Sequence, residues 1–342
     1  MKWKVISIFM LLFLLAACTE ESANNPDSVK NEKDESKEAS QSTSEAEFLP
    51  DEDLQKMDEG DHVLLLQEAL IKIGYNLPAD GVYSEATTWA ITDFQLQMED
   101  LFVTGIYDEA TKHALENILK QEETIEAGAA LPPLDEPALT NSGTQILGNP
   151  YDQLAIVNKT NALPEDYIPH DLVVPDVPFP FTEDLPKKQL RKPAALALEE
   201  LFAAANDAGF ELFAQSGYRS YERQVTLFAA YAEEHGEEAA NLFSARPGES
   251  EHQTGLAIDI SSASVNYQLV TDFGETPEGK WVEENAADFG FIIRYPEGKE
   301  DITEYQFEPW HLRYVGKKAA QEISETNITL EEYFAEINEQ AF

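Results

Sequence analysis

Cysteine is almost absent from this chain of 342 residues, since Cys18 is the only one. No disulfide can therefore form within the chain, and its stability must come from packing or from a bound metal. Basic residues are also scarce: 23 lysines and arginines stand against 65 aspartates and glutamates, for a net charge of −42. This balance argues against nucleic-acid binding and against charge-driven attachment to anionic lipid, because both need cationic side chains. The acid excess suits either salty or alkaline surroundings or a solvated surface that serves solubility.

A long hydrophobic run is missing as well. The apolar residues 5–17 follow Lys2 and Lys4, and the run is shorter than the roughly 20 residues of a membrane span, so it predicts a signal-peptide core. Small residues lead directly into Cys18, in a pattern that resembles a bacterial lipobox, where the thiol is lipidated. We expect residues 1–17 to be a lipoprotein signal peptide and Cys18 to anchor the protein on the extracellular face of the bacterial cytoplasmic membrane. An ordinary signal peptide followed by a stray cysteine is the alternative.

Composition divides the remaining chain into four expected regions. Residues 18–57 are polar, charged and poor in large apolar groups, which predicts a disordered tether. Residues 58–120 are patterned as helices, and residues 121–150 are rich in Pro, Gly, Ala and Ser, which indicates a linker. Residues 151–342 are dense with ordered-looking segments and are expected to form the second folded domain.

A pattern occurs twice in the first folded region. DGVYSEATTWAI starts at Asp80 and TGIYDEATKHAL starts at Thr104, 24 residues later. Each copy predicts a glycine turn, an N-cap at Ser84 or Asp108 and a short helix. With the helical run HVLLLQEALIKIG before them, they predict a three-helix module. These strings resemble the peptidoglycan-binding domain found beside many wall hydrolases, which implies docking on glycan and stem peptide without chemistry. A helical spacer is the alternative.

In the second region the string GLAIDIS is the best strand candidate. Its alternation places Leu256, Ile258 and Ile260 on one face and Asp259 on the other. A carboxylate that faces away from the apolar layer is a candidate functional group, although a solvated edge position would explain it equally well. His252 lies seven residues upstream in the turn-rich segment SEHQTG. Such a turn can bring imidazole and carboxylate, both ordinary zinc ligands, to one point.

A third ligand is needed to close a zinc site, and the chain has six histidines. Two belong to the first module, one lies in a proline-rich stretch and one ends a predicted helix; these are His62, His113, His170 and His235. His311, in EPWHLRYVG, remains, with Glu308 three residues before it. Pro309 disfavours helical geometry at Glu308, so this segment is expected to be extended or turned, and to present both side chains to one cleft.

Chemistry then suggests a role for each group. His252, Asp259 and His311 would hold Zn²⁺ and leave a fourth position open for water. Glu308 would take the proton from that water and pass it to the leaving amine. Arg219, in the turn SGYRS, is the candidate partner for developing negative charge, with a structural ion pair to a carboxylate as its alternative.

The same residues carry a second resemblance, over nearly all of 150–340. SGYRSYERQ, SEHQTGLAIDI and EPWHLRYVG are similar to VanY-type D-alanyl-D-alanine carboxypeptidases. The resemblance implies an α+β fold with a small antiparallel sheet flanked by helices. It also implies zinc on His252, Asp259 and His311, catalysis by Glu308 and Arg219, and substrate contacts from Arg219, Gln224 and Ser250.

The expected function is therefore removal of the terminal D-alanine from peptidoglycan stem peptides by a zinc enzyme that is docked on the wall. D,D-cleavage of pentapeptides is the leading expectation. L,D-cleavage of tetrapeptides, endopeptidase action on cross-links and wall binding without catalysis are the alternatives. The D,D and L,D enzymes differ in pocket shape, which the sequence does not reveal.

Overall fold

The computed structural model describes residues 49–132 and 138–340. The predicted signal peptide, Cys18 and most of the predicted tether lie outside the described residues. Glu47–Phe342 form one compact unit, and its two largest hydrophobic clusters lie in the two predicted folded regions. None of the helices within the described ranges is long and apolar enough to cross a membrane.

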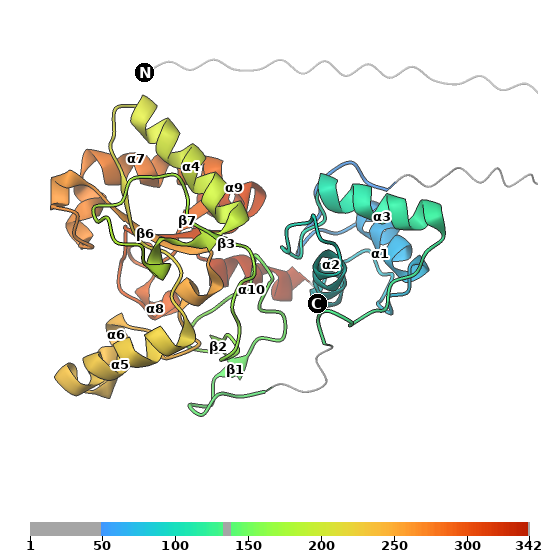
Figure 1. The fold of residues 1–342 in the computed structure, drawn as a ribbon, viewed down its shortest axis with the longest axis horizontal. Coiled ribbons are helices and arrows are strands. Elements are labelled where there is room, and N and C mark those ends of the chain that lie inside the picture. The colour runs from blue at the N-terminus through green and yellow to red at the C-terminus, as the bar shows by residue number, and fades with distance from the viewer. Residues whose placement is uncertain (1–48, 133–137, 341–342) are drawn as a thin grey trace, which may run out of the picture. The chain divides into compact units, whose positions relative to one another are not determined.

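Three helices build the first region, as predicted (Figure 1). They are α1 (Asp61–Lys72), α2 (Glu85–Leu96) and α3 (Glu109–Gln121). Asp108 caps α3 by accepting a hydrogen bond from the Thr111 backbone N–H at 2.8 Å. Ser84 occupies the N-cap position of α2, as predicted, although its side chain makes no capping hydrogen bond.

The duplication extends to two buried glutamines that hold the turns. The side-chain oxygen of Gln67 accepts hydrogen bonds from the backbone of Asp80 and Gly81, at 3.0 and 2.8 Å. The side-chain oxygen of Gln95 accepts hydrogen bonds from Thr104 and Gly105, both at 2.9 Å. Gly81 and Gly105 have φ values of 75° and 73°, a left-handed conformation that glycine adopts without steric cost. Each turn therefore depends on one glycine and one buried amide.

Both flanks of this helical region are packed against it. Leu54 and Tyr107 exchange backbone hydrogen bonds of 2.9 and 2.8 Å, although residues 18–57 are expected to be a tether. After α3, the Ile125 N–H donates to Ile73 O at 2.7 Å, and the backbone at Gly128, Ala130 and Leu131 donates to Asp93. The packed segment therefore runs from Leu49 to Leu131, because Leu49 joins the core, Ile125 packs against it and Leu131 is buried.

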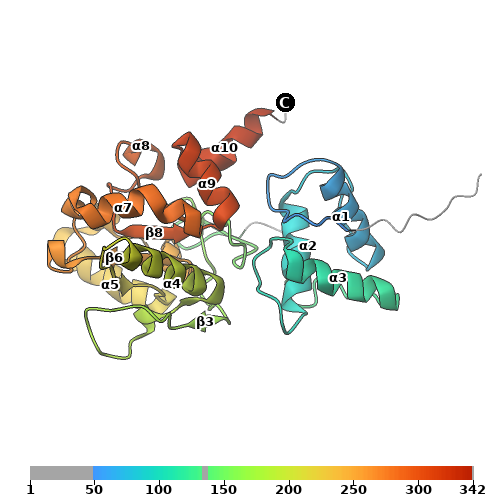
Figure 2. The same cartoon turned by 90° about the horizontal axis from the view of Figure 1, so that it is seen from above.

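The second region is an α+β domain with a small antiparallel sheet, as predicted (Figures 1 and 2). The strand order is β5-β6-β8-β7, and every neighbouring pair is antiparallel. The strands of this sheet are β5 (Phe213–Ser216), β6 (Ala257–Ser261), β7 (Phe291–Ile293) and β8 (His311–Tyr314). Two further pairs are short: β1 (Gln145–Ile146) with β2 (Asn161–Ala162), and β3 (Leu172–Val173) with β4 (Leu190–Arg191). Strand β1 lies in the segment expected to be a linker.

Helices cover the sheet, and the last described helix ends at Gln340. They are α4 (Lys192–Asp207), α5 (Tyr221–His235), α6 (Glu237–Phe243), α7 (Pro277–Asn285), α8 (Glu300–Thr303), α9 (Lys317–Thr326) and α10 (Leu330–Gln340). The apolar core joins Leu198 and Leu201 of α4 to Ile258 and Ile260 of β6 and Leu312 of β8. Helix α4 therefore packs on one face of the sheet, and alternation along β6 turns Asp259 toward the other face.

Candidate zinc site

The site begins at a turn that fixes His252. This residue lies in a single 3-10 turn, Glu251–Thr254, which ends at Gly255 with φ 69°. A side chain at position 255 would meet Arg191 Cγ at 2.9 Å, so both conformation and space require glycine there. His252 Nδ1 lies 2.9 Å from the Gly217 carbonyl oxygen. This contact leaves His252 Nε2 facing Asp259 Oδ2, at 3.4 Å.

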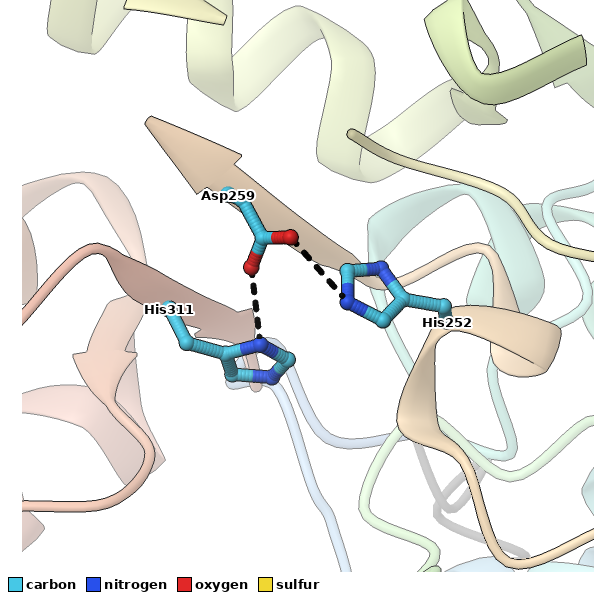
Figure 3. Close-up of side chains that lie close together, drawn as sticks. All are labelled: His252, Asp259 and His311. Atoms are coloured by element: carbon cyan, nitrogen blue, oxygen red, sulfur yellow. Dashed lines mark hydrogen bonds and ion pairs between the residues drawn. The ribbon is translucent and has the colours of Figure 1, made fainter. Parts of the chain in front are cut away.

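The other two predicted ligands are directly opposite each other on neighbouring strands. Asp259 of β6 pairs with His311 of β8 in the antiparallel register, which places both side chains on the same face of the sheet. His311 Nδ1 lies 3.0 Å from Asp259 Oδ1 (Figure 3). The two imidazole rings are nearly perpendicular, with centroids 5.0 Å apart. Figure 3 shows the carboxylate of Asp259 between the two histidines.

The three side chains suit a metal ion. One ligand atom from each of His252, Asp259 and His311 lies within 4.8 Å of the others, and all three residues are buried. Two imidazoles and one carboxylate are a common donor set for catalytic zinc, which keeps a fourth position for water. Each histidine also has an acceptor at its second ring nitrogen, namely Gly217 O for His252 and Glu251 for His311. Such partners fix the tautomer that a metal ligand needs.

Electrostatics at the two histidines differ. Burial lowers the pKa of His252 to about 3, although Asp259 opposes the shift; the imidazole is therefore neutral, as metal binding requires. Burial also disfavours the cation at His311, but hydrogen bonds to Asp259 and Glu251 outweigh it and raise the pKa to about 9. The site thus attracts one positive charge, and a bound metal cation would take the place of the proton.

Glu308 lies at the edge of this cluster in a turn, as Pro309 predicts. Its backbone N–H donates to Tyr295 O at 3.0 Å, and its carbonyl accepts from the His311 N–H at 3.0 Å. Burial is the main reason that the pKa of Glu308 is raised to about 7; Asp259 adds to the shift, and His311 and Arg219 oppose it. A carboxyl group that titrates near neutral pH is suited to proton transfer.

A cavity of about 310 Å³ joins these groups. Arg219, Ser250 and Glu308 line it together with the three candidate ligands. Its walls include Tyr231 of α5 and the aromatic rings of Tyr295, Tyr305 and Trp310. A larger cavity of about 460 Å³ lies beside α5, but Glu165 is the single metal-ligating side chain among its described lining residues. The chemistry therefore belongs to the smaller cavity.

Gln224, a predicted substrate contact, uses both the oxygen and the nitrogen of its side-chain amide for hydrogen bonds to other protein groups. Its side-chain oxygen accepts from Arg219 Nη1 at 2.9 Å, and its nitrogen donates to Ser244 Oγ at 3.3 Å and to Ala245 O at 2.5 Å. Gln224 is 1% exposed. The geometry places Gln224 behind Arg219, whereas Arg219 and Ser250 face the cavity.

The remaining described histidines lie away from this site. The side chains of His62, His113 and His235 are 57%, 64% and 45% exposed, and His170 is exposed as well. Glu251, in contrast, was not singled out from the sequence, although it stands between Ser250 and His252 and lines the cavity. Its position beside a predicted ligand was the one available signal.

Comparisons with known proteins agree with this arrangement. Residues 187–317 match the family "VanY: D-alanyl-D-alanine carboxypeptidase", and residues 59–115 match the "Putative peptidoglycan binding domain" family. The chain is 55% identical over 195 residues to "Putative carboxypeptidase YodJ" of Bacillus subtilis (strain 168), covering 57% of this chain and 71% of that protein.

Two further relatives extend the likeness. A D-alanyl-D-alanine carboxypeptidase of Enterococcus faecalis (strain ATCC 700802 / V583) is 33% identical over 219 residues, covering 59% of this chain and 78% of the other. The solved structure of the LdcB LD-carboxypeptidase is 54% identical, with a TM-score of 0.57 and coverage of 58% of this chain and 93% of that one. The chain therefore belongs to the VanY family of peptidoglycan carboxypeptidases and carries a peptidoglycan-binding module ahead of the catalytic domain.

Proposed function

We propose that this protein is a zinc carboxypeptidase that releases the C-terminal D-alanine from peptidoglycan stem peptides. The observation that carries the proposal is the convergence of His252, Asp259, His311, Glu308 and Arg219 on one cavity. A buried two-histidine, one-carboxylate set beside a carboxyl group with a raised pKa is the arrangement that metal-assisted peptide hydrolysis needs.

The side chains divide the work by position. His252, Asp259 and His311 would hold zinc, which would supply Lewis acidity and favour deprotonation of the attacking water. Glu308 accepts a proton as the water attacks and returns it to the leaving amine. Arg219 binds the substrate's terminal carboxylate or the developing oxyanion, and Gln224 holds the guanidinium in place through its 2.9 Å hydrogen bond. Ser250 contacts the substrate from the cavity wall.

For the bond that is cut, we favour the L,D reaction on tetrapeptide stems. The support is the 54% identity with the LdcB LD-carboxypeptidase over 93% of that chain. The D,D reaction on pentapeptides is the second candidate, because the matched family and the enterococcal relative bear that name. Arg219 favours either reaction over endopeptidase cleavage, because both substrates end in a free carboxylate.

The N-terminal region supports action at the wall. We propose that residues 58–120 dock on glycan and stem peptide and that Cys18 carries a lipid that holds the protein at the outer face of the cytoplasmic membrane. Mass analysis of the membrane-extracted protein tests this anchor. A diacylglyceryl adduct on Cys18 is expected, and an unmodified N-terminus after cleavage elsewhere contradicts it.

Mass spectrometry of muropeptides tests the activity. Purified protein is incubated with defined tetrapeptide and pentapeptide stems, with Glu308→Gln as the matched inactive variant. Loss of one alanine from the tetrapeptide is expected. Shortening of the pentapeptide alone would support the D,D reaction instead. If neither stem is shortened by zinc-loaded protein, the alternative of a wall-binding protein without catalysis is favoured.

A further inference from the structure

Glu251 is a fully buried carboxylate between two arginines and a candidate zinc ligand. One of its oxygens, Oε1, accepts hydrogen bonds from Arg294 Nε at 2.7 Å and from Arg313 Nη1 at 2.6 Å. The other oxygen, Oε2, lies 3.4 Å from His311 Nε2. Glu251 is 1% exposed and both arginines are 0% exposed. A buried charge of this kind persists only when it is paired and hydrogen-bonded on every side.

The two arginines are held by the strands that carry the site. Arg313 follows His311 by two residues on β8, and its Nη2 donates to the carbonyls of Gln153 and Ala155 at 3.0 and 2.9 Å. Arg294 directly follows β7, and its backbone N–H donates to His311 O at 3.1 Å. Both guanidinium groups are therefore fixed relative to the His311 backbone, and Glu251 is fixed by them.

The chain of ion pairs continues to the C-terminal helix. Glu331, on the first turn of α10, accepts from both terminal nitrogens of Arg294, at 2.8 and 2.5 Å. Asn158 also donates to Glu331, at 3.2 Å. The two carboxylates and the two arginines balance in charge, so the cluster needs no further ion to be neutral. Paired hydrogen bonds between arginine and carboxylate restrict orientation as well as distance.

We propose that Glu251 positions His311 for zinc, and that the chain from Glu251 through Arg294 to Glu331 makes helix α10 part of the support of the metal site. The inference rests on the zinc site proposed above. Nδ1 of His311 faces Asp259, so it is the nitrogen that would hold zinc. A hydrogen bond from Nε2–H to Glu251 selects the tautomer that this requires and would increase the donor strength of the ring. Glu251 contacts a ligand, so its role is positioning.

Zinc affinity of the mature full-length protein tests this role without substrate. The zinc dissociation constant is measured by competition with a chromophoric chelator, and the Co²⁺-substituted absorption spectrum reports ligand geometry. Glu251→Gln is expected to weaken zinc binding roughly 10- to 100-fold. Glu331→Gln is expected to weaken zinc binding less than Glu251→Gln does. Both substitutions are expected to alter the Co²⁺ absorption spectrum in the same direction.

Glu332→Gln is the matched control on the same turn of α10. Glu332 pairs with Lys299 at 2.9 Å and accepts from the Thr329 backbone at 2.8 Å, away from the Glu251 cluster. Its substitution should lower helix stability and leave zinc affinity unchanged. Thermal melts show which variants fold, and if Glu251→Gln does not fold, Glu331→Gln decides the question alone.

The outcomes separate this proposal from the proposed function. Wild-type zinc affinity in both Glu251→Gln and Glu331→Gln overturns the positioning role, even if the wild type releases D-alanine. Equal loss of affinity in Glu331→Gln and Glu332→Gln overturns the specific link to α10. A wild type that binds zinc but releases no D-alanine overturns the activity alone.

Discussion

Both folded regions bury polar side chains, but they do so differently. In the helical module the buried amides of Gln67 and Gln95 use their oxygens for two backbone N–H groups each, and their nitrogens for acceptors in the same module. In the catalytic domain, ionisable groups converge on a cavity. Buried charged side chains that share a cavity with other charged groups therefore indicate a functional site. A buried neutral side chain whose hydrogen bonds all go to nearby groups of the same module indicates a structural role.

The histidines of the module and those of the candidate zinc site also differ in burial. The side chains of His62 and His113 in the module are more than half exposed, whereas those of His252 and His311 are 7% and 5% exposed. Burying an imidazole has a cost in solvation unless its nitrogens find partners. In the catalytic domain those partners are a carbonyl and two carboxylates, which are the groups that orient metal ligands.

The largest expected effect comes from His252→Ala compared with His113→Ala. Removal of His252 deletes one of three candidate ligands, so bound zinc and turnover should both be lost. His113→Ala should retain both, because this side chain lies on the exposed surface of α3. Zinc content by mass spectrometry and D-alanine release are measured on both proteins. Equal zinc content in the two variants would contradict the assignment of His252 as a zinc ligand.

Glu308→Gln should lower kcat by about 10²- to 10⁴-fold, the usual contribution of a general base, while zinc content stays at the wild-type level. Glu304→Gln, at an exposed position four residues earlier, is the control and should retain kcat. Single-turnover assays with a defined stem peptide give the rates. Retained activity in Glu308→Gln would remove this residue from the mechanism.

The pH dependence of kcat/KM should follow the ionisation of the Glu308 carboxyl group. Its pKa is raised to about 7, chiefly by burial, and the base works only when deprotonated. Activity should therefore fall as pH drops through that value, by about tenfold per pH unit well below it. A bound divalent cation favours the carboxylate, so the midpoint should lie at about 7 or lower. A kcat/KM that rises as pH falls from 7 to 5 would contradict this.

The smallest expected effect on catalysis comes from Gln95→Ala in the module. The backbone N–H groups of Thr104 and Gly105 would lose their buried acceptor, at a cost of about 1–3 kcal/mol to the stability of the module. Binding to insoluble peptidoglycan should weaken, while kcat on a soluble stem peptide stays unchanged. Denaturant unfolding and pull-down assays measure the first two quantities. A parallel loss of kcat would show that catalysis depends on the integrity of the helical module.

Sequence patterns predicted much of this molecule. Helical spacing predicted the first helix of the module, and the repeated glycine turn and N-cap predicted the other two. Alternation in GLAIDIS predicted both the core face of β6 and the opposite face that carries Asp259. The proline after Glu308 predicted the turn that holds it. These features are local in sequence, so residue order suffices to find them.

The rest depends on contacts between distant segments. Glu251 meets Arg294 and Arg313, which are 43 and 62 residues away, and no local pattern reveals that these charges share one buried cluster. Gln224 is a second example. The resemblance to VanY-type enzymes suggests that Gln224 contacts substrate, whereas its side-chain amide is hydrogen-bonded to Arg219, Ser244 and Ala245. Packing also decides that residues 49–57 belong with the module.

Zinc titration of the metal-free protein shows whether turnover depends on metal at the His252, Asp259 and His311 site. D-alanine release from a defined stem peptide is followed while zinc is added in substoichiometric steps. Turnover is expected to rise in proportion to zinc and to reach a plateau at one zinc per chain, with no activity in His252→Ala at the same zinc concentrations. Full turnover by the metal-free protein, or by His252→Ala, would contradict it.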